Sequence, residues 1–137
     1  MTFNPIRQEA VASWTNKLEP LLERMALHSG GRYTPDHLYE GLASGLCWLA
    51  EIDNWRAAMV LKQVNWPTGL RELEIVSLAG AGMDEWGEAV FSAESIARDL
   101  RFNRITIPHG RKGWTKPCIS HGWKEAGVIL QKDLADG

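Results

Sequence analysis

The feature of this sequence that most constrains its fold is a strand-like run followed by a glycine bend and a helix. Residues 70–78 alternate Glu72 and Glu74 with leucine and isoleucine, which is the period of a β-strand with one polar face. Gly80 and Gly82 follow, and a helical pattern begins at Met83. Backbone N–H groups at such a bend can approach an anion closely, although glycine also serves conformational needs in tight turns.

The N-terminal third predicts two helices. Apolar positions with helical spacing run from Val11 to His28, and Pro20 predicts a kink or a division into two short helices. Thr34 followed by Pro35 is typical of a helix N-cap with proline at the first helical position.

The remaining periodicities predict alternating strands and helices. Strands over 46–52 and 55–64 flank a tight turn, and after the glycine bend we expect a helix to residue 100, a strand over 104–107, a short helix within 110–120 and a last strand over 128–134. The predicted order is α-α-β-β-β-α-β-α-β. This order indicates an α/β (α+β) mixed sheet with helices on both faces.

Length and composition indicate a single domain over residues 1–137. The sequence is 45% hydrophobic, which suffices for a core. It has two cysteines and no N-terminal apolar block, so we expect reduced thiols and no secretion by a signal peptide. No apolar run is long enough to span a membrane, so no membrane partner is expected.

Charge is distributed unevenly along the chain. Residues 1–97 hold 7 basic and 13 acidic groups, whereas residues 98–124 hold 7 basic groups and one acidic group. This basic segment indicates a surface for an anion or an acidic partner, or else a solvated face beside acidic helices.

The predicted order and the glycine bend resemble the GNAT superfamily of acyl-CoA N-acyltransferases. More specifically, the motifs Ala79–Trp86, Gly110-Arg111-Lys112-Gly113-Trp114 and Gly122-Trp123 resemble short GNAT-like proteins of tailed phages and prophages. The resemblance implies a site for the acetyl-CoA pyrophosphate at the bend. Its candidate cofactor-binding residues are Leu78, Ala79, Gly80, Ala81, Gly82, Met83, Arg111 and Lys112.

The chain departs from the family pattern at three places. Ser77 stands where the family has Arg or Gln, and Asp84 and Glu85 place negative charge in the first helical turn. Cys118 stands where the family often has the tyrosine that protonates the departing thiolate, so this thiol is either that acid or a packing residue. Glu72 or Glu74 is the candidate general base.

Histidine and cysteine spacing gives no metal site. His109, Cys118 and His121 offer three ligands at loose spacing, and zinc requires better-placed ligands, so no metal is expected. Adjacent Ser120 and His121 lack the strand-elbow context of a nucleophilic triad.

Two functions follow from these patterns. In the first, the fold is a scaffold in a phage particle or in the host cytoplasm, with a degenerate cofactor site. It binds another phage protein, or itself, through Trp114, Lys116, Trp123 and Lys124. In the second, the protein is an acetyl-CoA-dependent N-acyltransferase that acts on an amine. Nucleic-acid binding through the basic segment is the less favoured third class, because the chain is acidic overall.

Overall fold

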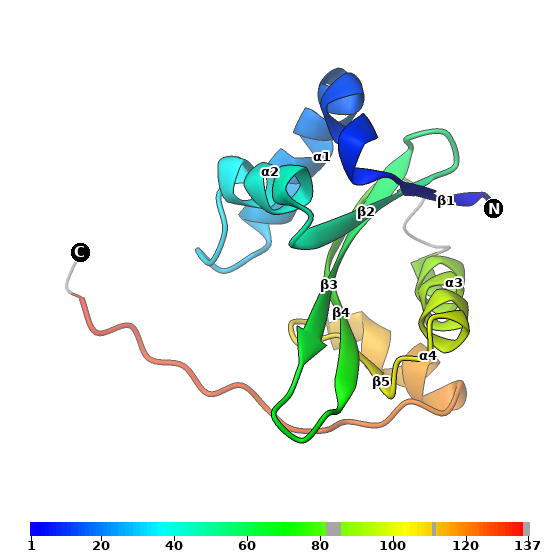
Figure 1. The fold of residues 1–137 in the computed structure, drawn as a ribbon. Helices are drawn as coiled ribbons and strands as arrows, with labels where there is room; N and C mark the ends of the chain where they lie inside the picture. Colours follow the sequence, from blue (N-terminus) through cyan, green and yellow to red (C-terminus); the bar gives the residue numbers. More distant parts are fainter. Residues whose placement is uncertain (82–85, 111, 136–137) are drawn as a thin grey trace.

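The computed structural model describes residues 1–81, 86–110 and 112–135. Its centre is a five-stranded mixed sheet in the order β1-β2-β3-β4-β5 (Figure 1). The first four strands pair antiparallel, and β5 pairs parallel with β4. The strands are β1 (Phe3–Ile6), β2 (Cys47–Ile52), β3 (Ala57–Asn65), β4 (Arg71–Gly80) and β5 (Arg104–Thr106).

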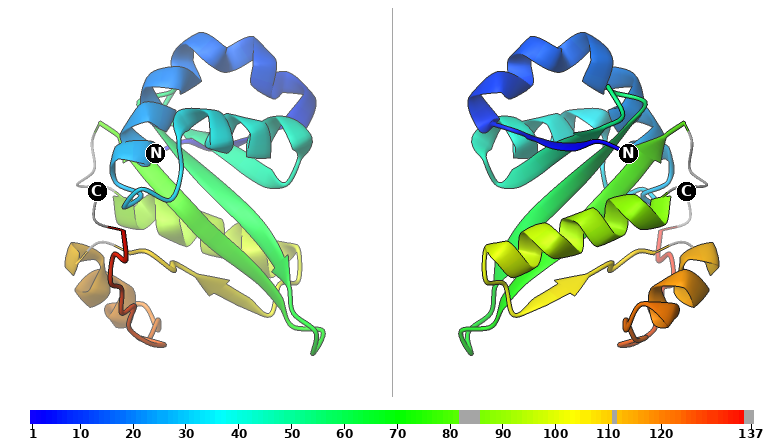
Figure 2. Two further views of the ribbon diagram at one scale, coloured as in Figure 1. Left: turned by 90° about the vertical axis from the view of Figure 1, so that its left-hand side faces the viewer. Right: turned by 90° about the vertical axis from the view of Figure 1, so that its right-hand side faces the viewer.

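Helices cover both faces of this sheet, as the sequence predicts (Figure 2). One buried cluster lies between the sheet and the N-terminal helices, and a second lies on the face that carries α3. The helices are η1 (Gln8–Trp14), α1 (Thr15–Leu27), α2 (Pro35–Ser44), α3 (Trp86–Asp99), η3 (Lys112–Trp114) and α4 (Thr115–Ser120). The α/β mixed-sheet fold class is confirmed.

The helix signals at the N-terminus are confirmed in part. The Thr34 hydroxyl accepts a hydrogen bond of 3.2 Å from the His37 N–H, Pro35 is the first residue of α2, and Gly45 ends the helix in the left-handed conformation. Pro20 lies inside α1 and does not divide it; the change of geometry comes earlier, where η1 meets α1. Burial of one apolar face of α1 stabilises the helix against the lost hydrogen bond at Pro20.

The sequence pattern missed one strand and predicted one strand that is absent. The sequence pattern missed β1, an edge strand that contains Pro5, because four residues interrupted by proline carry little strand signal. Conversely, the predicted last strand over 128–134 has no regular secondary structure here. Residues 128–134 pair with none of the five described strands, so their backbone makes no cross-strand hydrogen bonds.

The turn between β2 and β3 is longer than the Asp53-Asn54 pair suggests. It spans residues 53–56, and Asp53, Asn54 and Trp55 all have positive φ. The buried Glu51 carboxylate accepts hydrogen bonds from the Trp55 N–H at 2.8 Å and from the side-chain amide of Asn4. These bonds hold the strained turn against the end of the sheet.

Among the described residues, no helix combines the length and the apolar character needed to cross a membrane.

Candidate functional site

The sheet opens between β4 and β5. Only residues 72–74 of β4 pair with β5, whereas β4 continues to Gly80. A bulge lies just past the last paired residue: Leu61 pairs with Ile75 and Val60 with Ser77, which leaves Val76 as the additional residue. Bulges increase local twist and redirect the strand. The two strands therefore diverge, and no strand among the described residues pairs with the C-terminal half of β4 on that edge.

Backbone groups on that edge point into the opening. The Ala81 N–H donates to the Arg56 carbonyl at 2.8 Å, so this cross-strand pair is hydrogen-bonded. Hydrogen-bonded and non-hydrogen-bonded pairs alternate along an antiparallel ladder. The register Ala57–Gly80 and Met59–Leu78 then directs the N–H and C=O of Gly80 and Leu78 away from β3. These groups are available to an extended, amide-containing ligand.

A pocket of about 240 Å³ lies at this opening. Its walls come from the end of α1 and the loop after it, the start of α2, the middle of β4, and the segment that follows β5. The lining residues are Met25, His28, Ser29, Tyr33, Leu38, Ile75, Val76, Ser77, Leu78, Ile107, His109 and Trp114. The lining is mixed, with seven apolar residues and five polar ones. Polar groups that converge in this way can orient a small ligand.

His109 is the titratable pocket residue with a shifted pKa. His109 is exposed, and partial burial of its imidazole lowers the pKa below the usual 6.5; the Arg32 charge lowers it further, and the Glu74 charge acts in the opposite direction. A lowered pKa favours the neutral imidazole, which is the form that can accept a proton. Such a group in a pocket is a candidate general base.

Hydrogen bonds fix the loop that carries Tyr33 into the pocket. The Ser29 hydroxyl donates to the Ala26 carbonyl at 2.8 Å and accepts from the Tyr33 N–H at 3.1 Å. Arg32 donates to the Ser29 carbonyl at 3.0 Å. These hydrogen bonds fix the turn formed by residues 29–33. Tyr33 at the end of this turn lines the pocket.

The two glutamates predicted as base candidates have different surroundings. Glu72 is buried, and its carboxylate pairs with Arg104 at 3.6 Å. Glu74 is half-buried and lies in register with Lys62 of β3. Neither lines the pocket, and Glu74 acts there through its charge effect on His109.

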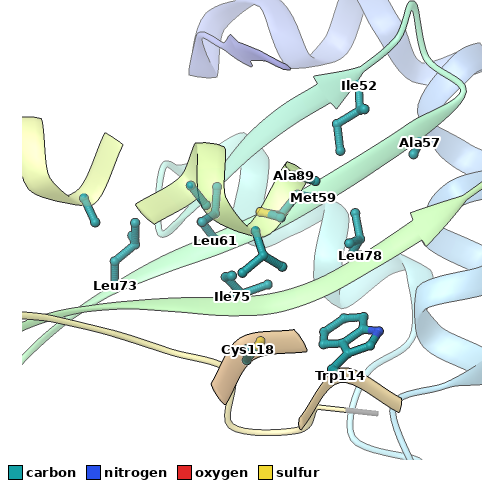
Figure 3. Packing of buried hydrophobic residues seen from close by; sticks show 13 residues of the cluster. Ile52, Ala57, Met59, Leu61, Leu73, Ile75, Leu78, Ala89, Trp114 and Cys118 are labelled. Carbon is teal, nitrogen blue, oxygen red and sulfur yellow. The ribbon is translucent and has the colours of Figure 1, made fainter. Parts of the chain in front are cut away.

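Cys118 lies in the apolar cluster on the α3 face, away from the pocket lining. It belongs to the same buried cluster as Ile75 and Trp114 (Figure 3). Burial raises the pKa of its thiol above 9.0, which makes it a weaker proton donor. This environment fits the packing role considered for Cys118 better than the acid role.

The predicted cofactor-binding residues fall into three groups. The backbones of Leu78 and Gly80 face the opening, whereas the Ala81 N–H is occupied by Arg56, and Ala79 is buried and paired with Ala58. Gly82, Met83 and Arg111 lie outside the described residues, and so does the side chain of Lys112 in η3.

Gly80 is required by strand packing. A Cβ at this position would lie 2.3 Å from the Ala57 Cα and 2.4 Å from the Arg56 carbonyl oxygen, and its φ is +144°. The missing side chain therefore lets β3 and β4 lie close together at the end of their pairing. This packing accounts for the glycine without any bound ligand.

The two tryptophans proposed as partner anchors are buried or half-buried, and partner binding through them stays a prediction. Trp114 is 8% exposed, belongs to the α3-side core and lines the pocket. The Trp123 indole is half-buried and donates to the Glu94 carboxylate at 2.9 Å. Lys116 and Lys124 are exposed. Within the described ranges, no cluster of three histidine, cysteine or acidic side chains is arranged to hold a metal ion.

No protein-family model matches this sequence, and no curated protein matches it. Solved structures match over the full length. A probable acetyltransferase has a TM-score of 0.68 at 15% identity, with 100% of this chain and 99% of that chain covered. This chain has a GNAT-like acetyltransferase fold. A predicted acetyltransferase from Clostridium acetobutylicum, solved with acetyl-CoA, has a TM-score of 0.64 at 15% identity, with 97% and 96% covered.

A third structure with the GNAT-like fold has a named acceptor. The ribosomal-protein-alanine N-acetyltransferase from Brucella melitensis biovar Abortus has a TM-score of 0.63 at 12% identity, and the alignment covers 99% of each chain. Identities this low establish the fold alone. The GNAT-like architecture expected from the glycine bend is thus confirmed, and the activity has to be argued from the site.

Sequence reasoning did not identify Tyr33 and His28 as pocket residues, and it considered His109 as a possible metal ligand. Their convergence depends on the α1–α2 loop lying opposite the segment after β5. No local motif marks that arrangement, since the contributing segments are far apart in the sequence.

Proposed function

We propose that the protein is an acyl-CoA-dependent N-acyltransferase that transfers an acyl group to an amine held in the pocket. The observation that carries this proposal is the opening of the sheet, where the part of β4 that pairs with no described strand runs beside a pocket lined by His109. The acetyl-CoA complex among the structures with the same fold supports the choice of donor.

The residues at the opening suit the pantetheine arm of the donor. That arm carries two amides, and the outward backbone groups of Leu78 and Gly80 can pair with amides as a neighbouring strand would. The apolar side chains of Leu78, Ile107 and Trp114 line the same opening. The Ala81 N–H is not free to bind a phosphate, so anion binding at the bend depends on residues beyond Ala81.

His109 is our candidate for the base that activates the amine. An ammonium cannot attack a carbonyl, so the acceptor must lose a proton before or during C–N bond formation. The amine nitrogen then bonds to the thioester carbonyl carbon, and the C–S bond breaks. The imidazole takes the amine proton, and the thiolate leaves with the sulfur electron pair and takes a proton from Tyr33 or from water. Glu74 stabilises the resulting imidazolium through its charge.

Binding and turnover of acetyl-CoA test the proposal directly. Calorimetric titration of the full chain with acetyl-CoA should show one site, and release of free thiol in the presence of primary amines should follow. His109→Gln should reduce kcat/KM by about 10²–10⁴-fold, the usual contribution of a general base. His121→Gln is the matched control, because that imidazole stacks on Phe91 at 3.8 Å and is absent from the pocket lining. No binding of acetyl-CoA at millimolar concentration would refute the proposal.

The scaffold role in a phage particle remains the other function that the sequence suggests. No contact or surface described above favours it over acyl transfer. Of its four proposed anchors, Trp114 and Trp123 are engaged within the molecule.

A further inference from the structure

One arginine in the turn formed by residues 29–33 is held in place without an acidic partner. Among the described residues, Arg32 makes no ion pair with a carboxylate. Its guanidinium donates to the Ser29 carbonyl at 3.0 Å and to the Gln131 side chain at 3.1 Å. Gly30, with a φ of +66°, leaves room for it, because a Cβ there would lie 2.7 Å from the Arg32 Nη1. A guanidinium has five N–H groups, so this one can still bind a carboxylate through two parallel hydrogen bonds.

The Arg32 guanidinium lies at the rim of the pocket. Ser29, whose carbonyl accepts its hydrogen bond, and the next residue, Tyr33, both line the pocket. Burial lowers the pKa of His109 and the Arg32 charge lowers it further, which places this charge near the imidazole. The Glu74 charge acts on the same imidazole in the opposite direction. One positive and one negative charge therefore lie close to the His109 side of the pocket.

The interior of the pocket differs from this rim. The polar lining residues are exposed or half-buried, whereas the buried lining residues are all apolar: Met25, Leu38, Ile75, Leu78 and Trp114. The volume of about 240 Å³ is smaller than the roughly 300–1,000 Å³ of sites for drug-sized ligands. The pocket therefore suits a compact molecule with an apolar group at one end and charged groups at the other.

We propose that the acceptor is a free α-amino acid with an apolar side chain, and that Arg32 binds its carboxylate. This proposal rests on the proposed acyl transfer. The amine and the carboxylate of an α-amino acid are attached to one carbon, so a carboxylate bound to Arg32 keeps the amine on the His109 side of the pocket. The Glu74 charge attracts the ammonium group to the same side.

The reaction gives an N-acyl amino acid and free CoA. The amine nitrogen bonds to the acyl carbon of the thioester as the C–S bond breaks. The ammonium group loses two protons in total, of which one ends on the CoA thiol and the other is released to solvent. The carboxylate takes no part in these bond changes, so its contact with Arg32 contributes to binding and orientation.

Matched pairs of acceptors test the proposal. Release of CoA thiol from acetyl-CoA by the full chain is measured at pH 8 with L-leucine, L-methionine and L-phenylalanine, each compared with its own carboxamide. For at least one pair, kcat/KM should be about tenfold higher for the amino acid, because only the carboxylate can form charge-assisted hydrogen bonds with Arg32. The amine of a carboxamide loses its proton more readily, so protonation acts against the predicted preference.

Variants of Arg32 connect the preference to this side chain. Arg32→Gln should lower kcat/KM for the amino acids to about the level of their carboxamides, mainly by raising KM. Arg32→Lys keeps the charge but not the two parallel hydrogen bonds, so it should retain part of the preference. At pH 8 the effect of these changes on the protonation of His109 is small, because the usual pKa of histidine is about 6.5. Arg7→Gln is the matched control, since Arg7 is exposed and does not line the pocket, and it should keep the full preference.

The possible results separate this proposal from the proposed function. Turnover of the carboxamides as fast as the amino acids, or a preference that persists in Arg32→Gln, would refute the carboxylate site and leave acyl transfer standing. Binding of acetyl-CoA without turnover of any of the three amino acids would also refute it. Failure of acetyl-CoA to bind would instead refute acyl transfer, and this proposal with it.

Discussion

The backbone N–H of Ala81 donates a 2.8 Å hydrogen bond to the carbonyl oxygen of Arg56. This bond extends the β3–β4 ladder one residue beyond Gly80, so the first half of the glycine bend belongs to the sheet. The Ala81 amide is therefore not available to an anion at the bend. The same bond sets the alternation that turns the Leu78 and Gly80 backbone groups toward the opening between β4 and β5.

Replacing Gly80 by alanine should destabilise the protein strongly. The new Cβ would lie 2.3 Å from the Ala57 Cα, and the backbone would keep a φ that L-residues rarely adopt. Overpacking and strain together predict a loss of about 2–5 kcal/mol in the free energy of unfolding, measured by urea denaturation. The control Gly87→Ala lies in α3, where a Cβ would make only an ordinary contact with Phe91, and should be neutral or stabilising. Equal effects of the two changes would contradict the packing argument.

The acidic side of the curve of kcat/KM against pH, its acid limb, should be set by the pKa of His109. The base must be neutral to act, and burial and the Arg32 charge lower its pKa below 6.5, so kcat/KM should rise with pH below 6.5 and be flat at neutral pH.

Two variants should move this limb in opposite directions. Arg32→Gln removes a positive charge that lowers the His109 pKa, so the limb should shift to higher pH; Glu74→Gln removes a negative charge that raises it, so the limb should shift to lower pH. The measurement is a pH profile of thiol release for each variant. Loss of all activity in Glu74→Gln would instead identify Glu74 as the base, as the sequence suggests.

Local signals predicted the parts of the fold that local physics determines. The Thr34 cap, the β4 alternation and the α3 periodicity each depend on neighbouring residues, and each is present in the structure. The pocket could not be predicted in this way, because Tyr33 and His109 meet only through the packing of the α1–α2 loop against the segment after β5.

The same limit explains the errors at the C-terminus. Residues 128–134 have a strand-like pattern, but a strand needs a partner, and this segment pairs with none of the described strands. Trp114 follows three residues after Arg111 in a turn-like sequence, which suggests exposure. Its burial results from the space between β4 and α4 that only the folded sheet creates.

Neither cysteine should be reactive in the native protein. Burial raises the pKa of the Cys47 thiol, with Lys62 and Glu74 exerting opposite smaller effects, and burial also raises the pKa of Cys118. Iodoacetamide at pH 8 should therefore label both slowly, and unfolding in urea should accelerate labelling at both positions. Cys118→Ala should retain most of the acyl-transfer rate, because the thiol does not line the pocket. A large drop in kcat with unchanged stability would instead support the acid role.

Trp114 should contribute more to stability than any exposed tryptophan. It is 8% exposed and packs with Leu78 and Cys118 in the α3-side core (Figure 3), so truncation would leave a large cavity. Trp114→Ala should lower the free energy of unfolding by about 3–5 kcal/mol in urea denaturation. Trp66→Ala, at a position 47% exposed in the β3–β4 turn, should change it by less than about 0.5 kcal/mol. If Trp114 were instead an anchor for a partner, Trp114→Ala would leave the free energy of unfolding unchanged and weaken only the association with that partner.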